Sequence, residues 1–450
     1  MATGECLVCR LKNIVAIPGA DNIVQASMFG EIVIVSKDYK EGDLGLLFDC
    51  ESQLNAEFAK QNNLYRHSNL NIDPNKVGYL EDTRRVRAIK LRGVKCSALF
   101  MPLSSLDYLG KGYPAEGTQI KEWQGKPICE KYVRPTRGSG NNKQIKKIQQ
   151  VLHFAEHLET DQLMRNLHKI NIGDKLIITS KLHGTSCRAG LLPCTGRKWW
   201  EKLLEKFVNR KNKYRFVVGS RHALKHVENQ AIDKKDSYYE DDIWTESAYK
   251  NFHGKLMAGE TVYYEIVGFL PSGASIMPIN SNEKLKKFLE PKEYKEFIDK
   301  FGKETVFHYG CKHGYDYVDN GHAGLEKVFE YKIFVYRITL TTEHGQAIDL
   351  SWEQVKRRCE ELGVAHVPEL EEAYILDKCT IVHYQNEDFW LKKTEKDDPN
   401  FPQHLNEGIC VRVENGSLRP QVYKSKRYAF KVLEGIIKDN SDWADIEESN

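Results

Sequence analysis

Lys181 is the residue with the clearest capacity for covalent chemistry, and it lies three residues before Gly184. The segment 175–180 has an apolar centre, which predicts a buried strand that delivers the lysine to a tight turn. Burial lowers the pKa of a lysine and makes it a nucleophile, and a glycine lets the backbone approach a ligand closely. The alternative is an exposed lysine beside a turn, since most lysines are exposed and the same spacing recurs at Lys90 and Gly93.

Further charged and aromatic side chains that could act as partners of such a lysine lie in or beside predicted strands. Each has an ordinary alternative, because a single Glu is more often a paired structural carboxylate, a Tyr a core residue, and an Arg or Lys a surface charge. Their order along the chain and the apolar runs around them favour a common site. These residues are Arg221, Glu265, Tyr336, Glu407, Lys424 and Lys426. The last two share one face of a strand, because side chains alternate along a strand with a period of two.

The elements that must position these residues fall into two domains, and the predicted fold class is α+β. Residues 1–130 contain short strand candidates separated by turn residues, which predicts an OB-type β-barrel. Residues 131–154 are predicted to be a linker and a helix, residues 155–435 alternate strand and helix candidates, and residues 436–450 form a tail. The strand candidates of the barrel are 6–16, 23–27, 31–35, 45–48, 86–91 and 97–101, with a polar excursion at 51–84.

Helices are predicted at 145–154 and 162–167. A third has clear boundaries, because Ser351 and Gln354 form a capping-box pattern and Gly363 ends the helix.

Two segments resemble insertions into the second domain. Residues 197–215 carry eight basic residues against Glu201 and Glu205, together with four aromatic residues. Such a segment can bind phosphates and stack on bases, or it can be an amphipathic helix that packs on the domain. Residues 282–302 are a mixed-charge helical stretch, which predicts a solvated face.

The composition is typical of a soluble globular protein. The chain of 450 residues is 41% apolar and 29% charged, and its net charge of +3 restricts any nucleic-acid surface to a local patch. No apolar run approaches the roughly 18 residues of a membrane span. Residues 1–5 lack the basic and apolar segments of a signal peptide, so a cytoplasmic protein without a membrane partner is expected. The eleven cysteines are scattered and odd in number, which favours reduced thiols.

Two cysteine-containing clusters could in principle hold zinc. Cys6 and Cys9 form a close pair, and Cys311 lies between His308 and His313. Neither has a second pair at the spacing of a zinc finger, so packing in the core or in a loop is the expected role.

In their order, the candidate residues resemble the motifs of the covalent nucleotidyltransferase superfamily of ligases and capping enzymes. The correspondence runs from Lys181 to Lys426, and only 24 residues follow it, too few for the OB domain that DNA ligases and capping enzymes carry after these motifs. With the barrel candidate placed before the lysine, the chain resembles the Deinococcus-type ATP-dependent RNA ligases. His183 stands where Asp is commonest in the superfamily, which favours the RNA branch, and Ser180 stands where some relatives have Glu.

This resemblance implies an N-terminal OB domain, a nucleotidyltransferase domain and an ATP-dependent RNA ligase activity. Lys181 would attack the α-phosphate of ATP to form lysyl-AMP, and the AMP would pass to an RNA 5′-phosphate before a 3′-hydroxyl seals the ends. His183 would belong to the nucleotide site, Tyr336 would stack on adenine, and Glu265 with Arg221 would hold the ribose. Glu407 would orient Mg²⁺ or Mn²⁺, and Lys424 and Lys426 would bind the α-phosphate.

Two other functions remain open at this level. A capping-type guanylyltransferase would use GTP instead of ATP, and a non-catalytic RNA-binding protein would need only the barrel and the basic segment at 197–215.

Overall fold

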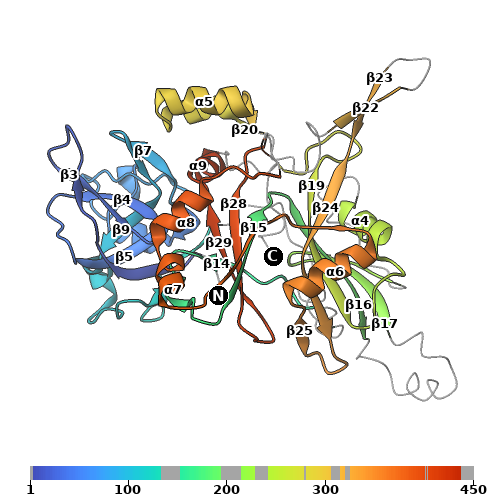
Figure 1. Ribbon diagram of the computed structural model, residues 1–450. Helices are drawn as coiled ribbons and strands as arrows, with labels where there is room; N and C mark the ends of the chain where they lie inside the picture. The colour runs from blue at the N-terminus through green and yellow to red at the C-terminus, as the bar shows by residue number, and fades with distance from the viewer. Residues whose placement is uncertain are drawn as a thin grey trace.

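The computed structural model describes residues 4–132, 153–193, 214–228, 242–277, 280–305, 315–319, 325–400, 402 and 404–436. Figure 1 shows the N-terminal domain, a central sheet that contains β15, β28 and β29, and a further sheet that contains β16, β19 and β24, one after another across the molecule. No helix of the described residues is long and apolar enough to cross a membrane.

The N-terminal domain is built from two small antiparallel sheets. β10 (Gln119–Ile120), β1 (Cys6–Arg10), β5 (Leu44–Asp49) and β9 (Ala98–Pro102) form one sheet in that order, and β2 (Val15–Ala16), β3 (Ile23–Met28) and β4 (Glu31–Ser36) form the other. Ser97 joins the two sheets, since its amide donates to the Ile32 carbonyl at 2.9 Å and its hydroxyl accepts from the Ile32 amide at 3.2 Å. Alternate residues of β4 are buried, so one face of the strand lines a core, as expected for a barrel.

Several short elements complete this domain. β6 (Ser52–Leu54) pairs with β13 (Cys129–Lys131), so residues of the predicted polar excursion join the end of the domain. The others are α1 (Ala56–Gln61), the 3₁₀ helices Ser68–Leu70 and Leu103–Leu109, and the strand pairs β7 (Ile89–Leu91) with β8 (Val94–Cys96) and β11 (Glu122–Trp123) with β12 (Lys126–Pro127).

The second domain contains two larger sheets. The five-stranded sheet has the order β14 (Asp161–Gln162), β29 (Gln421–Lys426), β28 (Gly408–Glu414), β15 (Lys175–Lys181) and β27 (Glu369–Tyr374). The seven-stranded sheet has the order β18 (Leu224–Val227), β17 (Tyr214–Ser220), β16 (Thr185–Pro193), β19 (Glu260–Gly268), β24 (Tyr331–Thr341) and β25 (Ala347–Asp349), with β26 (Ala365–His366) parallel to β24.

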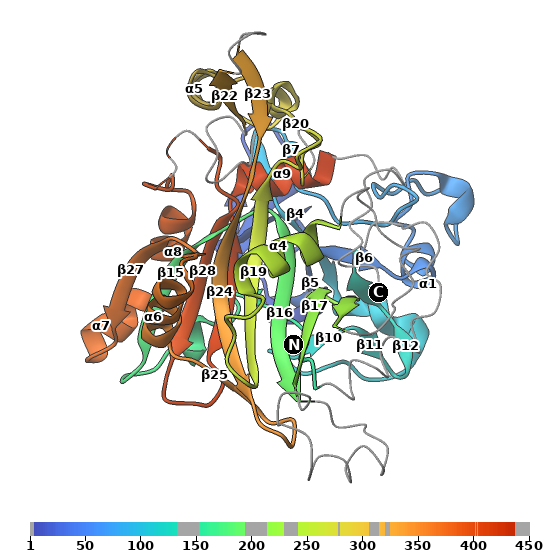
Figure 2. The same cartoon turned by 90° about the vertical axis from the view of Figure 1, so that its right-hand side faces the viewer.

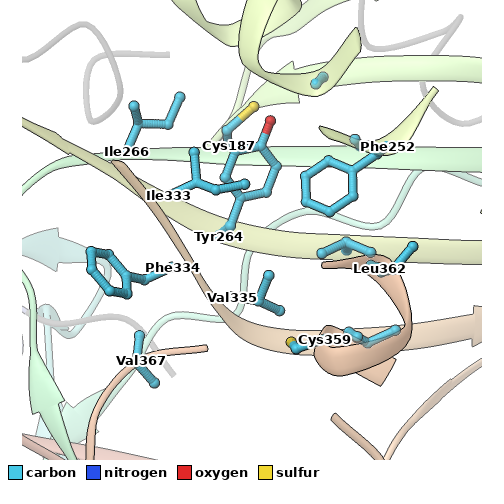
Figure 3. Close-up of a cluster of buried hydrophobic side chains, with 14 of the residues drawn as sticks. Cys187, Phe252, Tyr264, Ile266, Ile333, Phe334, Val335, Cys359, Leu362 and Val367 are labelled. Atoms are coloured by element: carbon cyan, nitrogen blue, oxygen red, sulfur yellow. The ribbon is translucent and has the colours of Figure 1, made fainter. Parts of the chain in front are cut away.

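Helices α4 (Ile243–Phe252) and α6 (Trp352–Leu362) pack on the seven-stranded sheet in one apolar core. In Figure 3, Phe252 of α4 lies beside Tyr264 of β19, while Cys359 and Leu362 of α6 lie beside Val335 of β24. This core fixes the backbone of β19 and β24, and therefore the side chains that these strands present on their other face.

The remaining elements border the five-stranded sheet or project from the domain. Figure 2 shows α7 and α8 beside β27, and it shows the β22–β23 hairpin at the top of the molecule. They are the 3₁₀ helix Leu167–Lys169, β20 (Asn280–Ser281), the 3₁₀ helix Asn282–Lys287, α5 (Pro291–Phe301), β21 (Glu304–Thr305), β22 (Tyr315–Asp319), β23 (Leu325–Phe329), α7 (Lys378–Tyr384), α8 (Glu387–Thr394) and α9 (Tyr428–Ile436).

Three predicted elements differ from the structure. The strand 6–16 is broken between β1 and β2, where Asn13 has a positive φ of 53°. The predicted helix 162–167 is wrong, because its first residue ends β14 and the next residues form a turn before a 3₁₀ helix. Residues 282–302 are helical, but they are not only a solvated face, since the apolar side of α5 packs with Leu285 and Leu289.

The two cysteine-containing clusters differ in whether the structure describes them. Cys6 and Cys9 pack in different apolar clusters on opposite faces of β1, so they do not form one metal site. His308, Cys311 and His313 lie outside the described residues, as do most of the segment 197–215, the helix 145–154 and the tail 436–450.

Candidate active site

Lys181 is the last residue of β15, and the register of the sheet places it opposite Gly408 at the start of β28. Gly408 has a φ of 152°, and a Cβ at this position would lie 2.0 Å from the Ser425 carbonyl, so only glycine fits beside β29. A Cβ on Gly184 would lie 2.2 Å from the Ile266 carbonyl. Gly184 therefore allows a close approach to β19, and it also lines the pocket described below, so its expected approach to a ligand stays a prediction.

The amine of Lys181 contacts the carboxylate of Glu407 where β15 ends and β28 begins. Lys181 Nζ is 2.7 Å from Glu407 Oε1, Lys426 Nζ is 3.5 Å from the same oxygen, and His183 Nδ1 is 3.6 Å from Oε2. The Glu407 side chain is only 3% exposed, and it lies just before β28. The strand order β29-β28-β15 thus brings together residues that are 245 positions apart (426 − 181).

The protonation of this cluster follows from the balance of burial and charge. Burial raises the pKa of Glu407, but the charges of Lys181 and Lys426 outweigh it and hold that pKa well below its usual range. Burial lowers the pKa of Lys181, yet Glu407 outweighs burial and the net shift is upward. Burial is therefore not enough to lower the net pKa of Lys181, because the carboxylate of Glu407 favours the ammonium form in the nucleotide-free protein.

Lys424 and Lys426 point from β29 to the same end of the site, as their spacing predicts. Both contact Glu51 of the N-terminal domain: Lys424 Nζ lies 2.8 Å from Glu51 Oε2, and Lys426 Nζ lies 2.9 Å from Glu51 Oε1. Lys426 also lies 3.2 Å from Glu434 of α9. Glu51 was not singled out from the sequence, where it stands in a polar segment with no local pattern that marks it.

Side chains from other segments hold Ser180 and His183, which lie on either side of Lys181 in the sequence. The hydroxyl of Ser180 donates to Asp398, and its amide donates to the Pro368 carbonyl at 2.9 Å. The His183 ring packs edge-on against Phe430 of α9 with ring centroids 4.9 Å apart.

The seven-stranded sheet supplies the other end of the site. Ser186 of β16 donates to Glu265 Oε2 of β19 at 3.0 Å. Burial raises the pKa of Glu265 to about 7, against the opposing effects of Lys181 and Ser186. Arg221 lies in the turn after β17 and also lowers this pKa by its charge.

Tyr336 of β24 is held by a second residue that was not singled out from the sequence. Its hydroxyl lies 2.9 Å from His157 Nδ1, and the two rings meet edge-on at 5.3 Å between centroids. Burial and the charges of Arg221 and Arg337 hold the pKa of His157 well below its usual range, so this imidazole is neutral.

One pocket contains all eight candidate residues, together with residues of the N-terminal domain. The five-stranded sheet and its neighbours supply the cationic end, and the seven-stranded sheet supplies Tyr336, Glu265 and Ser186. The candidates are Lys181, His183, Arg221, Glu265, Tyr336, Glu407, Lys424 and Lys426, and the N-terminal domain adds Glu51 and Arg85.

The two domains have the architecture of an OB-fold domain followed by a nucleotidyltransferase domain. A family model described as RNA ligase matches residues 174–433, more than half of the chain, and a model described as an OB-fold domain matches residues 6–103. The chain belongs to the RNA ligase family. The predicted fold class, α+β with an OB-type barrel before the nucleotidyltransferase domain, is thereby confirmed.

Solved structures of a Naegleria gruberi RNA ligase share this fold. A complex of that protein with PPi has a TM-score of 0.53 and 15% identity, and the match covers 95% of this chain and 98% of the other. A mutant of the same ligase with ATP and Mn has a TM-score of 0.54 and 16% identity, with 97% of this chain and 99% of the other covered. No curated protein matches the chain.

Proposed function

We propose that the protein is an ATP-dependent RNA ligase that joins a 5′-phosphate end to a 3′-hydroxyl end. The observation that carries this proposal is the meeting of Lys181, Glu407 and two further lysines at the end of one pocket. Family membership supports RNA joining, and the complexes of the Naegleria ligase with ATP and Mn support ATP and a divalent cation as its cofactors.

The first step transfers AMP to the enzyme. The neutral Lys181 amine attacks the α-phosphorus of ATP, an N–P bond forms, and the bond from phosphorus to the leaving pyrophosphate breaks. Lys424 and Lys426 are proposed to hold the phosphate oxygens and to offset the charge that develops on them, and their place in the pocket beside Lys181 supports this role. Tyr336 offers a ring for stacking on adenine, and Glu265 with Arg221 offers partners for the ribose.

Sealing then takes two more displacements. An oxygen of the RNA 5′-phosphate attacks the phosphorus of lysyl-AMP, and Lys181 leaves as the N–P bond breaks. The RNA 3′-hydroxyl then attacks the 5′-phosphorus, and AMP leaves as the phosphodiester forms. The N-terminal barrel and the segment 197–215 are proposed to bind the RNA, since OB-fold domains and basic aromatic segments bind nucleic-acid strands.

Glu407 is proposed to hold the divalent cation. Among the described residues no group of three or more His, Cys, Asp or Glu side chains could enclose a metal ion, so water and phosphate oxygens would supply most ligands. Such a site suits Mg²⁺ or Mn²⁺, which are bound by one or two carboxylates and substrate phosphates. When bound, the cation would polarise the α-phosphate and favour the neutral form of the nearby lysine.

A reducing compartment, the cytoplasm, is proposed for this protein. The cysteines within the described parts of the chain form no disulfide, and most of them are buried.

Covalent labelling tests the function directly. Incubation with α-phosphate-labelled ATP and Mn²⁺ should give a labelled protein band, whereas Lys181→Ala should abolish the label, because the only proposed nucleophile is removed. Lys90→Ala is the matched control, since Lys90 has the same spacing to a glycine but pairs with Glu290 outside the pocket. Label on Lys181→Ala would contradict the assignment.

The same assay separates the alternatives. A capping-type guanylyltransferase would take label from GTP in preference to ATP, and a non-catalytic RNA-binding protein would take none.

A further inference from the structure

Glu51 of the N-terminal domain lies in the nucleotide pocket although it belongs to the other domain. It follows β5 and precedes β6, and its backbone is fixed from both sides: its amide donates to Asp49 at 3.0 Å and its carbonyl accepts from Tyr132 at 2.8 Å. Its side chain is 8% exposed, and both carboxylate oxygens contact lysines of β29. The carboxylate is therefore an ordered part of the cationic end of the pocket.

The two carboxylate oxygens of Glu51 each contact one lysine, as two oxygens of a bound phosphate would. One oxygen lies 2.8 Å from Lys424 Nζ and the other lies 2.9 Å from Lys426 Nζ. Burial raises the pKa of Glu51, but the charges of Lys424 and Lys426 outweigh it and keep the carboxylate ionised. An ionised carboxylate and a phosphate cannot share two ammonium groups at this distance without strong repulsion between like charges.

Other ion pairs besides those of Glu51 also join the two domains. Asp49 Oδ2 lies 3.1 Å from Arg165 Nη2, and Glu31 Oε1 lies 2.7 Å from Lys431 Nζ. Both pairs cross the same interface, yet none of these four residues lines the pocket. Glu51 thus differs from the other acidic residues of this interface, because it alone among these three contacts the lysines assigned to the nucleotide.

We propose that the carboxylate of Glu51 occupies the phosphate-binding position in the free protein, and that the polyphosphate of the nucleotide displaces it. This inference rests on the proposed function, since it takes Lys424 and Lys426 as phosphate ligands. The apparent nucleotide affinity is then the intrinsic affinity multiplied by the fraction of molecules in which Glu51 does not contact the two lysines. Nucleotide binding also releases one contact between the two domains.

Glu51→Gln tests the inference in the full-length protein. The amide keeps the shape of the side chain but removes its charge, so it competes less well for the two lysines. The ATP concentration that gives half-maximal labelling of Lys181 should fall roughly tenfold, because the competing state is depopulated. Glu31→Gln is the matched control: it weakens another buried pair of the interface and should leave this concentration unchanged.

Binding of pyrophosphate, measured by calorimetry, provides a readout that does not need catalysis. Glu51→Gln should bind pyrophosphate more tightly by a similar factor, while adenosine, which lacks phosphate, should bind both proteins equally. Unchanged or weaker pyrophosphate binding would overturn the inference, and tighter adenosine binding would show a general change of the pocket and overturn it too.

These outcomes are separate from those of the proposed function. Wild-type protein that takes no label from ATP would contradict the ligase assignment, whereas labelling with an unaltered ATP requirement in Glu51→Gln would contradict only the role of Glu51. If Glu51→Gln fails to fold in a thermal unfolding assay, Glu51→Asp replaces it. Its side chain is one methylene shorter and reaches the two lysines less well, so it should also tighten pyrophosphate binding, and failure to do so would overturn the inference.

Discussion

Glu265 combines burial with a carboxylate that titrates near neutral pH, and this has a consequence for stability. Its pKa is raised by burial to about 7, above the ordinary value of 4.5 for a glutamate. The folded protein therefore binds more protons than the unfolded chain between these two values, and the stability linked to this group is complete below about pH 4.5 and is lost as the pH rises through about 7.

Glu265→Gln should remove this loss, because an amide does not ionise. We expect the variant to unfold at a temperature about 2 °C or more above the wild type at pH 8, with the difference vanishing toward pH 4.5. Thermal unfolding across this pH range, without nucleotide, measures the effect. A difference that is constant with pH would show that Glu265 does not titrate in this window.

Site residues at the ends of predictable strands were identified from the sequence. Their partners from distant segments of the chain were not. Lys181, Glu407 and Lys426 each end or begin a predictable strand, so their convergence could be anticipated. Glu51 lies 373 positions from Lys424, and His157 lies 179 positions from Tyr336. Neither pairing leaves a local pattern, since each depends on how segments far apart in the chain pack together.

Among the elements, helix α6 was predicted with its boundaries because its ends carry their own hydrogen-bond chemistry. Ser351 Oγ accepts from the Gln354 amide at 3.3 Å, and Gln354 Oε1 accepts from the Ser351 amide at 2.8 Å, which confirms the capping box. The segment 162–167 was predicted as a helix from its apolar spacing, whereas Gln162 ends β14, which pairs with β29, and residues 163–165 form a turn.

Ser351→Ala should lower the free energy of unfolding by about 1 kcal/mol, since it removes an N-cap acceptor. Thermal unfolding should show a shift of about 2–4 °C. Ser104→Ala, at an exposed position in the N-terminal domain, is the control and should shift the transition by less than about 1 °C. Equal shifts in both variants would argue against a role for the cap.

At the scale of the whole molecule, a buried ion pair fixes the N-terminal domain on the nucleotidyltransferase domain. The side chains of Asp49 and Arg165 are 3% and 5% exposed, so removal of one partner leaves a buried charge. Arg165→Met should destabilise the protein by about 3–5 kcal/mol, measured by denaturant unfolding.

The double variant Asp49→Asn with Arg165→Met should recover most of this loss, because the charge left by the single change is gone. Additive losses in the double variant would mean that the two residues stabilise the protein independently of each other.

The split of the pocket between two sheets has a further consequence for ligand binding. Tyr336 and Glu265 belong to the seven-stranded sheet, whereas Lys181 and Lys424 belong to the five-stranded sheet. A nucleotide in this pocket would be a bivalent ligand, with its nucleoside and its phosphates anchored on separate layers and joined by a short covalent tether. Adenosine and pyrophosphate should then bind far more weakly apart than joined, by the effective concentration that the tether provides. After AMP transfer to Lys181 the phosphate would be bound covalently to the five-stranded sheet, while the nucleoside would keep its non-covalent contacts with the seven-stranded sheet until the adenylate leaves.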